Sequence, residues 1–259
     1  MDLFARVVVG IDGTDWGFEA LRQALALMPA EGSVVNGVTA LDLRGTVSTG
    51  FEVGRWRDLL AQEAEQARSE AAGIIGDRDG CSARVERGTP VDVLRRARDR
   101  LDATMLALGG RRSSRLLGIV MGDTATELLH DARCSVLLAR PSRDDRVWEP
   151  ASVVVGVDGS AGSLAALAAA DDIATRLGGT VDVVGAGSQA ADHAGADWAG
   201  RISSPNRDDP VAALLERSER ADLVVVGSRG LHGLQALGSV SERVAHQARC
   251  SVLVVHTPA

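Results

Sequence analysis

The chain contains no lysine, and all 28 of its basic residues are arginine. A Walker-type phosphate loop needs a Gly-Lys-Ser or Gly-Lys-Thr step, so the absence of lysine excludes that class of nucleotide site. Acidic residues outnumber basic ones, and the net charge is −7. We therefore expect no sequence-independent binding to nucleic acid or to anionic membranes, because such binding needs a basic surface.

Cysteine is also scarce, with three residues and no CxxC pair. Cys134 and Cys250 each precede a Val- and Leu-rich run, where cysteine usually acts as a small buried apolar residue. Each also follows a histidine by four residues, but two such ligands do not make a zinc site. We expect no metal centre and a reducing compartment. No apolar run approaches the ~20 residues of a membrane span, and no secretory signal opens the chain, so we expect a cytoplasmic protein.

What the chain does contain is an internal repeat, in which three groups of motifs occur twice in the same order. Self-similarity on this scale predicts two copies of one folding unit. The three pairs are Val8–Thr14 with Val154–Ser160, Leu108–Arg111 with Val226–Arg229, and His130–Leu137 with His246–Leu253.

Apolar periodicity divides the first copy into alternating strands and helices. The predicted strands are residues 6–11, 33–41, 82–87, 104–108 and 135–139. The predicted helices are residues 15–28, 54–75, 90–100 and 123–131. This order predicts an α/β fold with two tandem doubly wound units, each a five-stranded, mostly parallel sheet with helices on both faces.

A polar segment at 140–146 separates the copies and predicts domains at 1–142 and 150–259. The second copy is shorter. Asp12 and Asp158 are 146 positions apart, but Pro90 and Pro210 are only 120 apart. The missing 26 residues match the predicted helix at 54–75 and its flanks. We therefore expect the second unit to lack one helix, which would leave one face of its sheet thinly covered.

The repeated motifs resemble those of the universal stress protein family. They are Val-Gly-x-Asp-Gly-Ser after a strand, Gly-Ser-Arg-Gly after a later strand, and Gly-Ser opening a helix, in Val153–Ser160, Ala221–Gly230 and Gly238–Val255. The resemblance covers both halves and implies a tandem member of the family. It further implies binding of an adenine nucleotide (ATP or AMP) in some branches and no strong catalysis. Family dimers pair through the last strand, and a tandem chain can form that pairing within itself as a pseudo-dimer; a homodimer also stays open.

In ATP-binding members the pattern is Gly, two residues, Gly, nine residues, then Gly-Ser or Gly-Thr. Glycines let backbone amides approach phosphates, and the following helix offers its free N–H groups. The first half has Gly109 but Arg112 at the second position, and then Gly122-Asp123. We expect Asp123 to cap its helix, to occupy the amides that a phosphate would use, and to repel phosphate.

The second half keeps all three glycines and the serine, although seven residues rather than nine separate the second and third glycines. Its neutral Ser239 leaves the helix start open to an anion, so the second half is the favoured site. The resemblance also places the Asp after the first strand near the adenosine. The candidate residues are Asp158, Ala186, Val226, Gly227, Gly230, Gly238, Ser239 and Val240, with Asp12, Val38, Gly109 and Gly122 in the first half.

Other functions stay open. Residues 185–190 read GxGxxA after a predicted strand, a weak dinucleotide fingerprint that would indicate an oxidoreductase. The stretch that follows does not form the required βαβ unit, and aligning the repeats sets Gly185-Ala186 against Gly37-Val38. The remaining alternative is a degenerate scaffold that binds a partner protein and no nucleotide. We expect a stress-response or regulatory protein that is not an enzyme.

Overall fold

The computed structural model describes residues 3–29, 32–44, 51–112, 119–120, 122–131, 133–142, 146–185, 198, 202–203, 209–228 and 239–257. The chain divides into two compact units, Met1–Gly109 and Gly110–Ala259. The division falls inside the first repeat, so the last helix and last strand of that repeat group with the second repeat. The limits 1–142 and 150–259 stay a prediction about the duplicated sequence.

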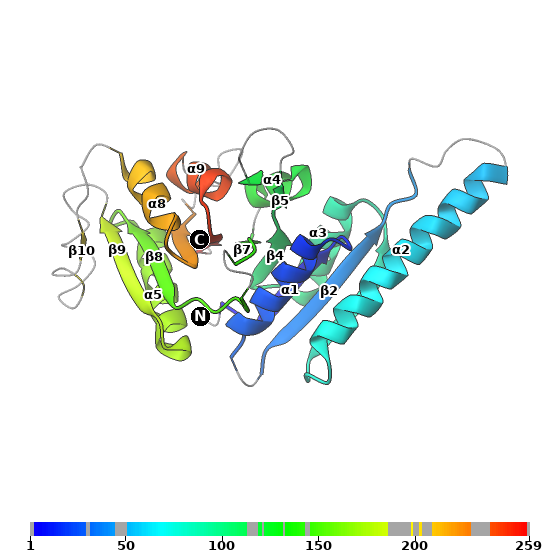
Figure 1. Cartoon of the computed structure of the whole chain (residues 1–259), viewed down its shortest axis with the longest axis horizontal. Helices are drawn as coiled ribbons and strands as arrows, with labels where there is room; N and C mark the ends of the chain where they lie inside the picture. The colour runs from blue at the N-terminus through cyan, green and yellow to red at the C-terminus, as the bar shows by residue number, and fades with distance from the viewer. Residues whose placement is uncertain are drawn as a thin grey trace. The chain divides into compact units, whose positions relative to one another are not determined.

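The first unit is built on a parallel sheet with strand order β4–β1–β2–β3 (Figure 1). The strands are β1 (Arg6–Ile11), β2 (Val34–Leu41), β3 (Cys81–Arg87) and β4 (Met105–Gly109). Val7, Val8 and Val9 are fully buried, as expected for a strand covered on both faces. All four strands lie within one residue of their predicted limits.

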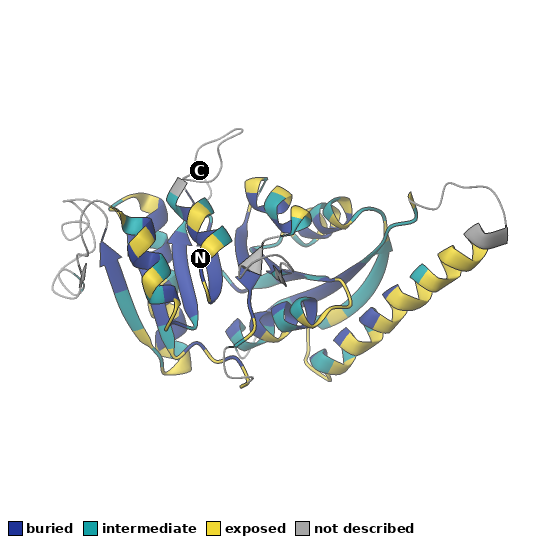
Figure 2. Cartoon of the chain, turned by 45° about the horizontal axis from the view of Figure 1, so that its top comes forward, coloured by how far each residue is buried: buried dark blue, intermediate teal, exposed yellow. Residues whose placement is uncertain are grey.

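Three helices cover this sheet: α1 (Asp15–Leu27), α2 (Phe51–Ile75) and α3 (Pro90–Leu101). α1 and α2 contact each other on one face, and α3 packs on the other. α1 begins where Thr14 accepts a hydrogen bond from the Gly17 amide, and Thr89 caps α3 just before Pro90. The part of α2 at residues 54–63 is almost wholly exposed (Figure 2), so Ala64, Ala67 and Ala71 begin its packed part.

The second unit has a six-stranded sheet with order β10–β9–β8–β11–β12–β7. Its strands are β7 (Ser135–Ala139), β8 (Ser152–Val157), β9 (Thr180–Gly185), β10 (Ile202–Ser203), β11 (Leu223–Gly227) and β12 (Ser251–Val255). Neighbours are parallel except for β7 and β12, which pair antiparallel with Leu137 opposite Leu253. These leucines are equivalent in the repeat, so the two last strands pair about a local two-fold axis.

Helix α5 (Ala161–Leu177) packs against β8 and β11, and it ends at Gly178, whose φ of 72° is left-handed. α8 (Pro210–Ser218) and α9 (Ser239–Gln247) contact each other and the sheet. The unit also contains α4 (Asp123–His130) and a short hairpin that sequence patterns did not predict, β5 (Arg111–Arg112) with β6 (Ile119–Val120). Among the described helices none has the length and apolarity to cross a bilayer.

The predicted loss of a helix in the second repeat falls on residues 186–201, which lie outside the described part of the chain apart from Trp198. This connection is nonetheless too short for a helix like α2, which has 25 residues. On the adjoining strand Val183 is buried and Val181 is partly exposed. The sheet at β9 is therefore fully covered at Val183 and only partly covered at Val181.

Candidate functional site

The carboxyl end of β8 runs into a tight turn built by Asp158. Its Oδ1 accepts hydrogen bonds from the amide (3.0 Å) and the hydroxyl (2.6 Å) of Ser160, and Gly159 has a φ of 84°. Ser160 in turn caps α5 by accepting from the Ser163 amide at 3.2 Å. Asp158 is exposed, so this carboxylate both shapes the turn and faces solvent.

The carboxyl end of β11 meets the first turn of α5 through backbone alone. A Cβ added to Gly227 would lie 2.4 Å from the Gly162 carbonyl carbon, and one added to Gly162 would lie 2.6 Å from the Ser228 carbonyl oxygen. The Ser163 hydroxyl then accepts from the Asp158 amide at 3.2 Å. The structure therefore brings Asp158 and Gly227 together at the start of α5, and Val226 directly precedes Gly227 on β11.

A serine–histidine contact beside this point was missed by sequence reasoning. Ser228 Oγ lies 3.4 Å from His256 Nδ1, and the His256 amide donates to the Ser135 hydroxyl at 3.0 Å. Ser228 is buried and His256 is half-buried. The residue order gave no signal for this pair, because 28 positions separate its members and only the pairing of β11 with β12 brings their ends together.

The remaining second-half candidates are only partly described. Ser239 is the first residue of α9, and Val240 follows it with a half-exposed side chain. Ala186, Gly230 and Gly238 lie outside the described residues, as does the side chain of Ser239. The described candidates therefore lie at the ends of β8 and β11 and at the start of α9. The loop proposed to bind the phosphates lies outside the described residues and stays a prediction.

The first half repeats the turn at the end of β1. Asp12 Oδ1 accepts from the Thr14 amide (3.0 Å) and hydroxyl (2.6 Å), and Gly13 has a φ of 76°. A Cβ on Gly109 would lie 2.5 Å from the carbonyl carbon of Trp16, so this glycine also serves a close backbone approach. Val38 is buried within β2, and Gly122 belongs to the second unit.

The expectation that Asp123 caps α4 is wrong. Gly122 occupies the N-cap position with φ −68° and ψ 159°, and no side chain makes the capping hydrogen bond. Asp123 is instead the first helical residue, and its side chain is exposed. The carboxylate lies one position beyond the cap, where it still favours the helix dipole and still opposes an incoming anion by charge.

The alignment of Gly185-Ala186 with Gly37-Val38 is also wrong. Ile11 pairs with Thr39 and its repeat counterpart Val157 pairs with Gly185, so the structural equivalent of Gly185 is Thr39. A shared glycine misled the comparison by two positions. The register against the first strand of each repeat sets the true correspondence.

Comparison with known proteins places these features in a family. A sequence model described as the universal stress protein family matches residues 3–140 and 205–256. A universal stress protein of Mycolicibacterium smegmatis is 31% identical over 228 residues, covering 74% of each chain. One from Mycobacterium tuberculosis is 36% identical over 186 residues, which cover 59% of this chain and 61% of the relative's length.

Among solved structures, a universal stress protein from Archaeoglobus fulgidus has the same fold over nearly the whole chain. The TM-score is 0.74 at 21% sequence identity, with 99% of each chain covered. The duplicated strand–turn–helix units, the matched sequence model and the relatives agree. The chain belongs to the universal stress protein family.

Proposed function

We propose that the second repeat binds an adenine nucleotide, ATP or AMP, and that the protein is a stress-response or regulatory binding module rather than a catalyst. One observation carries the proposal. The exposed Asp158 carboxylate, the side-chain-free backbone of Gly227 and the first turn of α5 meet at the carboxyl ends of β8 and β11. In open α/β sheets, ligands bind in the crevice at the carboxyl ends of the strands.

Each residue then has a chemical role. Asp158 is proposed to accept hydrogen bonds from the adenosine hydroxyls, with Ala186, Val226 and Val240 as apolar or backbone contacts. Gly227, Gly230, Gly238 and Ser239 are proposed at the phosphates, where bare amides and the start of α9 favour negative charge. Asp12, Val38, Gly109 and Gly122 are proposed as a weaker site in the first repeat, where Val38 is the register equivalent of Val184 and not of Ala186, and no metal is required at either site.

Ligand recovery and a pair of matched variants test the proposal. Mass spectrometry of material released by denaturing the purified full chain should recover ATP or AMP, and calorimetry should detect binding of the same nucleotide. Asp158→Ala should weaken that binding at least about tenfold, equivalent to about 1.4 kcal/mol. The matched Asp12→Ala should leave it nearly unchanged. Equal losses in both variants would contradict the assignment to the second repeat.

A second candidate is a scaffold that binds a partner protein and no nucleotide. One observation favours it: two of the candidate residues already have structural roles that need no ligand. Asp158 builds its turn, and Gly227 is required by packing against Gly162. A preparation that releases no nucleotide and gives no calorimetric signal with ATP or AMP would select the scaffold. Recovery of NAD or NADP would instead favour the oxidoreductase reading of residues 185–190.

A further inference from the structure

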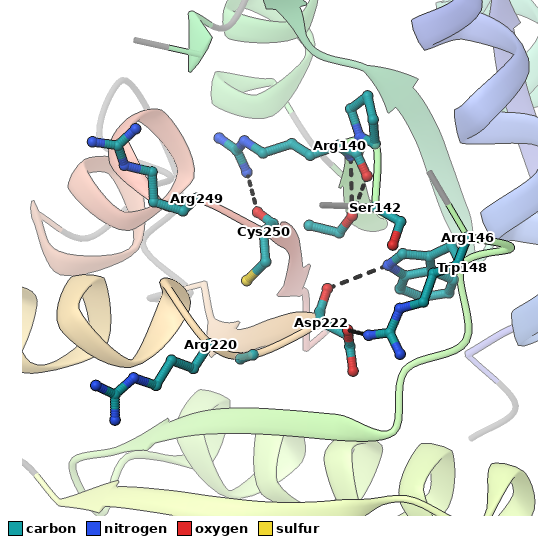
Figure 3. A pocket seen from close by; sticks show the side chains of 11 residues that line it. Arg140, Ser142, Arg146, Trp148, Arg220, Asp222, Arg249 and Cys250 are labelled. Atoms are coloured by element: carbon teal, nitrogen blue, oxygen red, sulfur yellow. Dashed lines mark hydrogen bonds and ion pairs between the residues drawn. The ribbon is translucent and has the colours of Figure 1, made fainter. Parts of the chain in front are cut away.

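A cavity of about 110 Å³ opens in the second unit at the amino-terminal ends of its parallel strands. Asp222 directly precedes β11 and Cys250 directly precedes β12, so the cavity lies at the opposite end of these strands from Asp158 and Gly227. We name it the arginine cavity, after a lining that includes Arg140, Arg146, Trp148, Arg220, Asp222 and Arg249 (Figure 3).

The one carboxylate among the described lining residues is already engaged. Asp222 Oδ1 accepts from Arg146 Nη2 at 2.8 Å, and Oδ2 accepts from the Ser152 amide at 2.9 Å. The Asp222 carbonyl accepts from the indole Nε1 of Trp148 at 3.3 Å. Asp222 therefore holds residues 146–152 against the start of β11. It neutralises the charge of no more than one of the four arginines in the lining.

Arg140 adds a fixed positive charge to the wall. Its guanidinium is buried and donates to the Cys250 carbonyl at 2.8 Å and to the Ala245 carbonyl at 2.6 Å. Burial lowers the pKa of Arg140 to about 10, so the group still carries its charge at neutral pH. Carbonyl partners hold the guanidinium in place without cancelling its charge.

Two further arginines lie at the rim of the cavity, and neither guanidinium is paired with a described residue. Arg220 and Arg249 are exposed, and their guanidinium groups make no hydrogen bond or ion pair with any residue that the structure describes. Figure 3 shows both side chains directed away from Asp222. Exposed arginines change rotamer at little cost, so both groups can turn toward an anion at the mouth.

We propose that the arginine cavity binds a phosphate group, either as free inorganic phosphate or as the phosphate of a small metabolite. The described lining contains four arginines and one carboxylate, in a chain whose net charge is −7, and a bound anion would draw in the two exposed guanidinium groups. The planar guanidinium fork matches phosphate oxygens in a bidentate manner. A water needs only about 10–15 Å³ of such space, so a cavity of about 110 Å³ admits a tetrahedral oxyanion and some waters.

The competing role for the rim arginines is structural. Arg220 and Arg249 follow closely after α8 and α9, where cations favour the negative ends of the helix dipoles. This role predicts a change in thermal stability when the charges are removed and predicts no binding of phosphate. The two roles are therefore separable by measurement.

The test is calorimetric titration of the full chain with inorganic phosphate and, separately, with glycerol phosphate, against sodium chloride at equal ionic strength. Wild type should bind at least one of the two, and the one that binds more tightly identifies the source of the phosphate. The double variant Arg220→Gln/Arg249→Gln should bind it at least tenfold more weakly. Arg133→Gln/Arg243→Gln removes the same charge from exposed arginines outside the cavity and should bind as wild type does. Circular dichroism verifies that both double variants are folded.

Adding the variant Ser239→Asp separates this cavity from the proposed nucleotide site. Ser239→Asp should leave phosphate binding intact, and Arg220→Gln/Arg249→Gln should leave binding of ATP or AMP intact. Three results would overturn the proposal: no phosphate binding by wild type, equal losses in both double variants, or loss in Ser239→Asp alone. A fall in melting temperature without any phosphate binding would assign the rim arginines to the helix ends.

Discussion

The strand–turn–helix starts of the two repeats, Asp12 to α1 and Asp158 to α5, share the same hydrogen bonds at the same distances. In each, an aspartate oxygen accepts from the amide at 3.0 Å and the hydroxyl at 2.6 Å two residues on. They differ one turn later, where the first repeat has Gly17 and the second has Ser163. A Cβ at Gly17 would lie 2.5 Å from Asp12 Oδ1.

Ser163 turns the same position into a hydrogen-bonding link. Its hydroxyl donates to the Ser160 carbonyl at 2.9 Å and accepts from the Asp158 amide at 3.2 Å. The shared turn is thus explained by local backbone chemistry that needs no ligand. The feature that separates the halves as anion sites lies elsewhere, at the start of the later helix, where one repeat has Asp123 and the other Ser239.

The largest change in the free energy of unfolding is expected at Gly109 and Gly227, the equivalent glycines at which a strand end meets the start of a helix in each repeat. Gly109→Ala and Gly227→Ala each place a Cβ far inside van der Waals contact with backbone atoms, at 2.5 Å and 2.4 Å. Backbone atoms cannot move aside as a flexible side chain can, so each change should lower the free energy of unfolding by about 3 kcal/mol or more. Urea denaturation followed by circular dichroism measures the loss.

Gly73→Ala is the control, because a Cβ there meets nothing within 4 Å in the last turn of α2. It should raise stability by about 0.5–1 kcal/mol, since alanine favours a helix over glycine. If either Gly109→Ala or Gly227→Ala unfolds at the wild-type midpoint, the close approach of strand end to helix start is not rigid in solution.

The next largest effect is expected on nucleotide affinity when the residues that distinguish the two repeats, Asp123 and Ser239, are exchanged. Ser239→Asp puts a carboxylate at the start of α9 and should weaken binding of ATP or AMP about tenfold, or about 1.4 kcal/mol. The reciprocal Asp123→Ser should create or strengthen binding in the first repeat. Calorimetry with each nucleotide measures both changes, and Ser239→Asn and Asp123→Asn show whether charge rather than shape is responsible.

An unchanged affinity in Ser239→Asp would remove the electrostatic account of the difference between the repeats. If only Asp123→Ser fails to gain nucleotide binding, the conclusion concerns the first repeat alone. It would mean that Arg112, which stands where the family pattern has a second glycine, blocks the first repeat by itself.

The smallest change in the free energy of unfolding is expected when the side-chain cap of α1 or of α5 is removed. Thr14→Ala and Ser160→Ala each remove a side-chain acceptor from the first turn, at 3.3 Å and 3.2 Å respectively. Each should lower the free energy of unfolding by about 1 kcal/mol. The Ser163 hydroxyl bonds to the Ser160 carbonyl and the Asp158 amide, which are both backbone groups, so these links survive both changes and the two losses should agree within about 0.5 kcal/mol. A much larger loss at Ser160, measured by the same denaturation, would reveal coupling that the first repeat lacks.

Several elements were predictable because local chemistry fixes them. The strand 135–139, the strand 6–11 and the helix beginning at Pro90 follow from a Val- and Leu-rich run or from a capping residue followed by proline. The capping role of Asp123 was not predictable to one position, because sequence patterns do not resolve the first helical residue from the cap. Gly185 was misaligned for a related reason: register depends on the neighbouring strand.

Residues close together in the chain were enough to establish the duplication, the order of the main strands and helices, and the Asp-Gly turns. The folded chain was needed to show that Leu137 lies opposite Leu253, that Ser228 lies by His256, and that Arg140, Arg220 and Arg249 line one cavity. Such contacts join segments about thirty or more positions apart. Periodicity and propensity describe a segment's own conformation, whereas strand pairing decides which distant segments become neighbours.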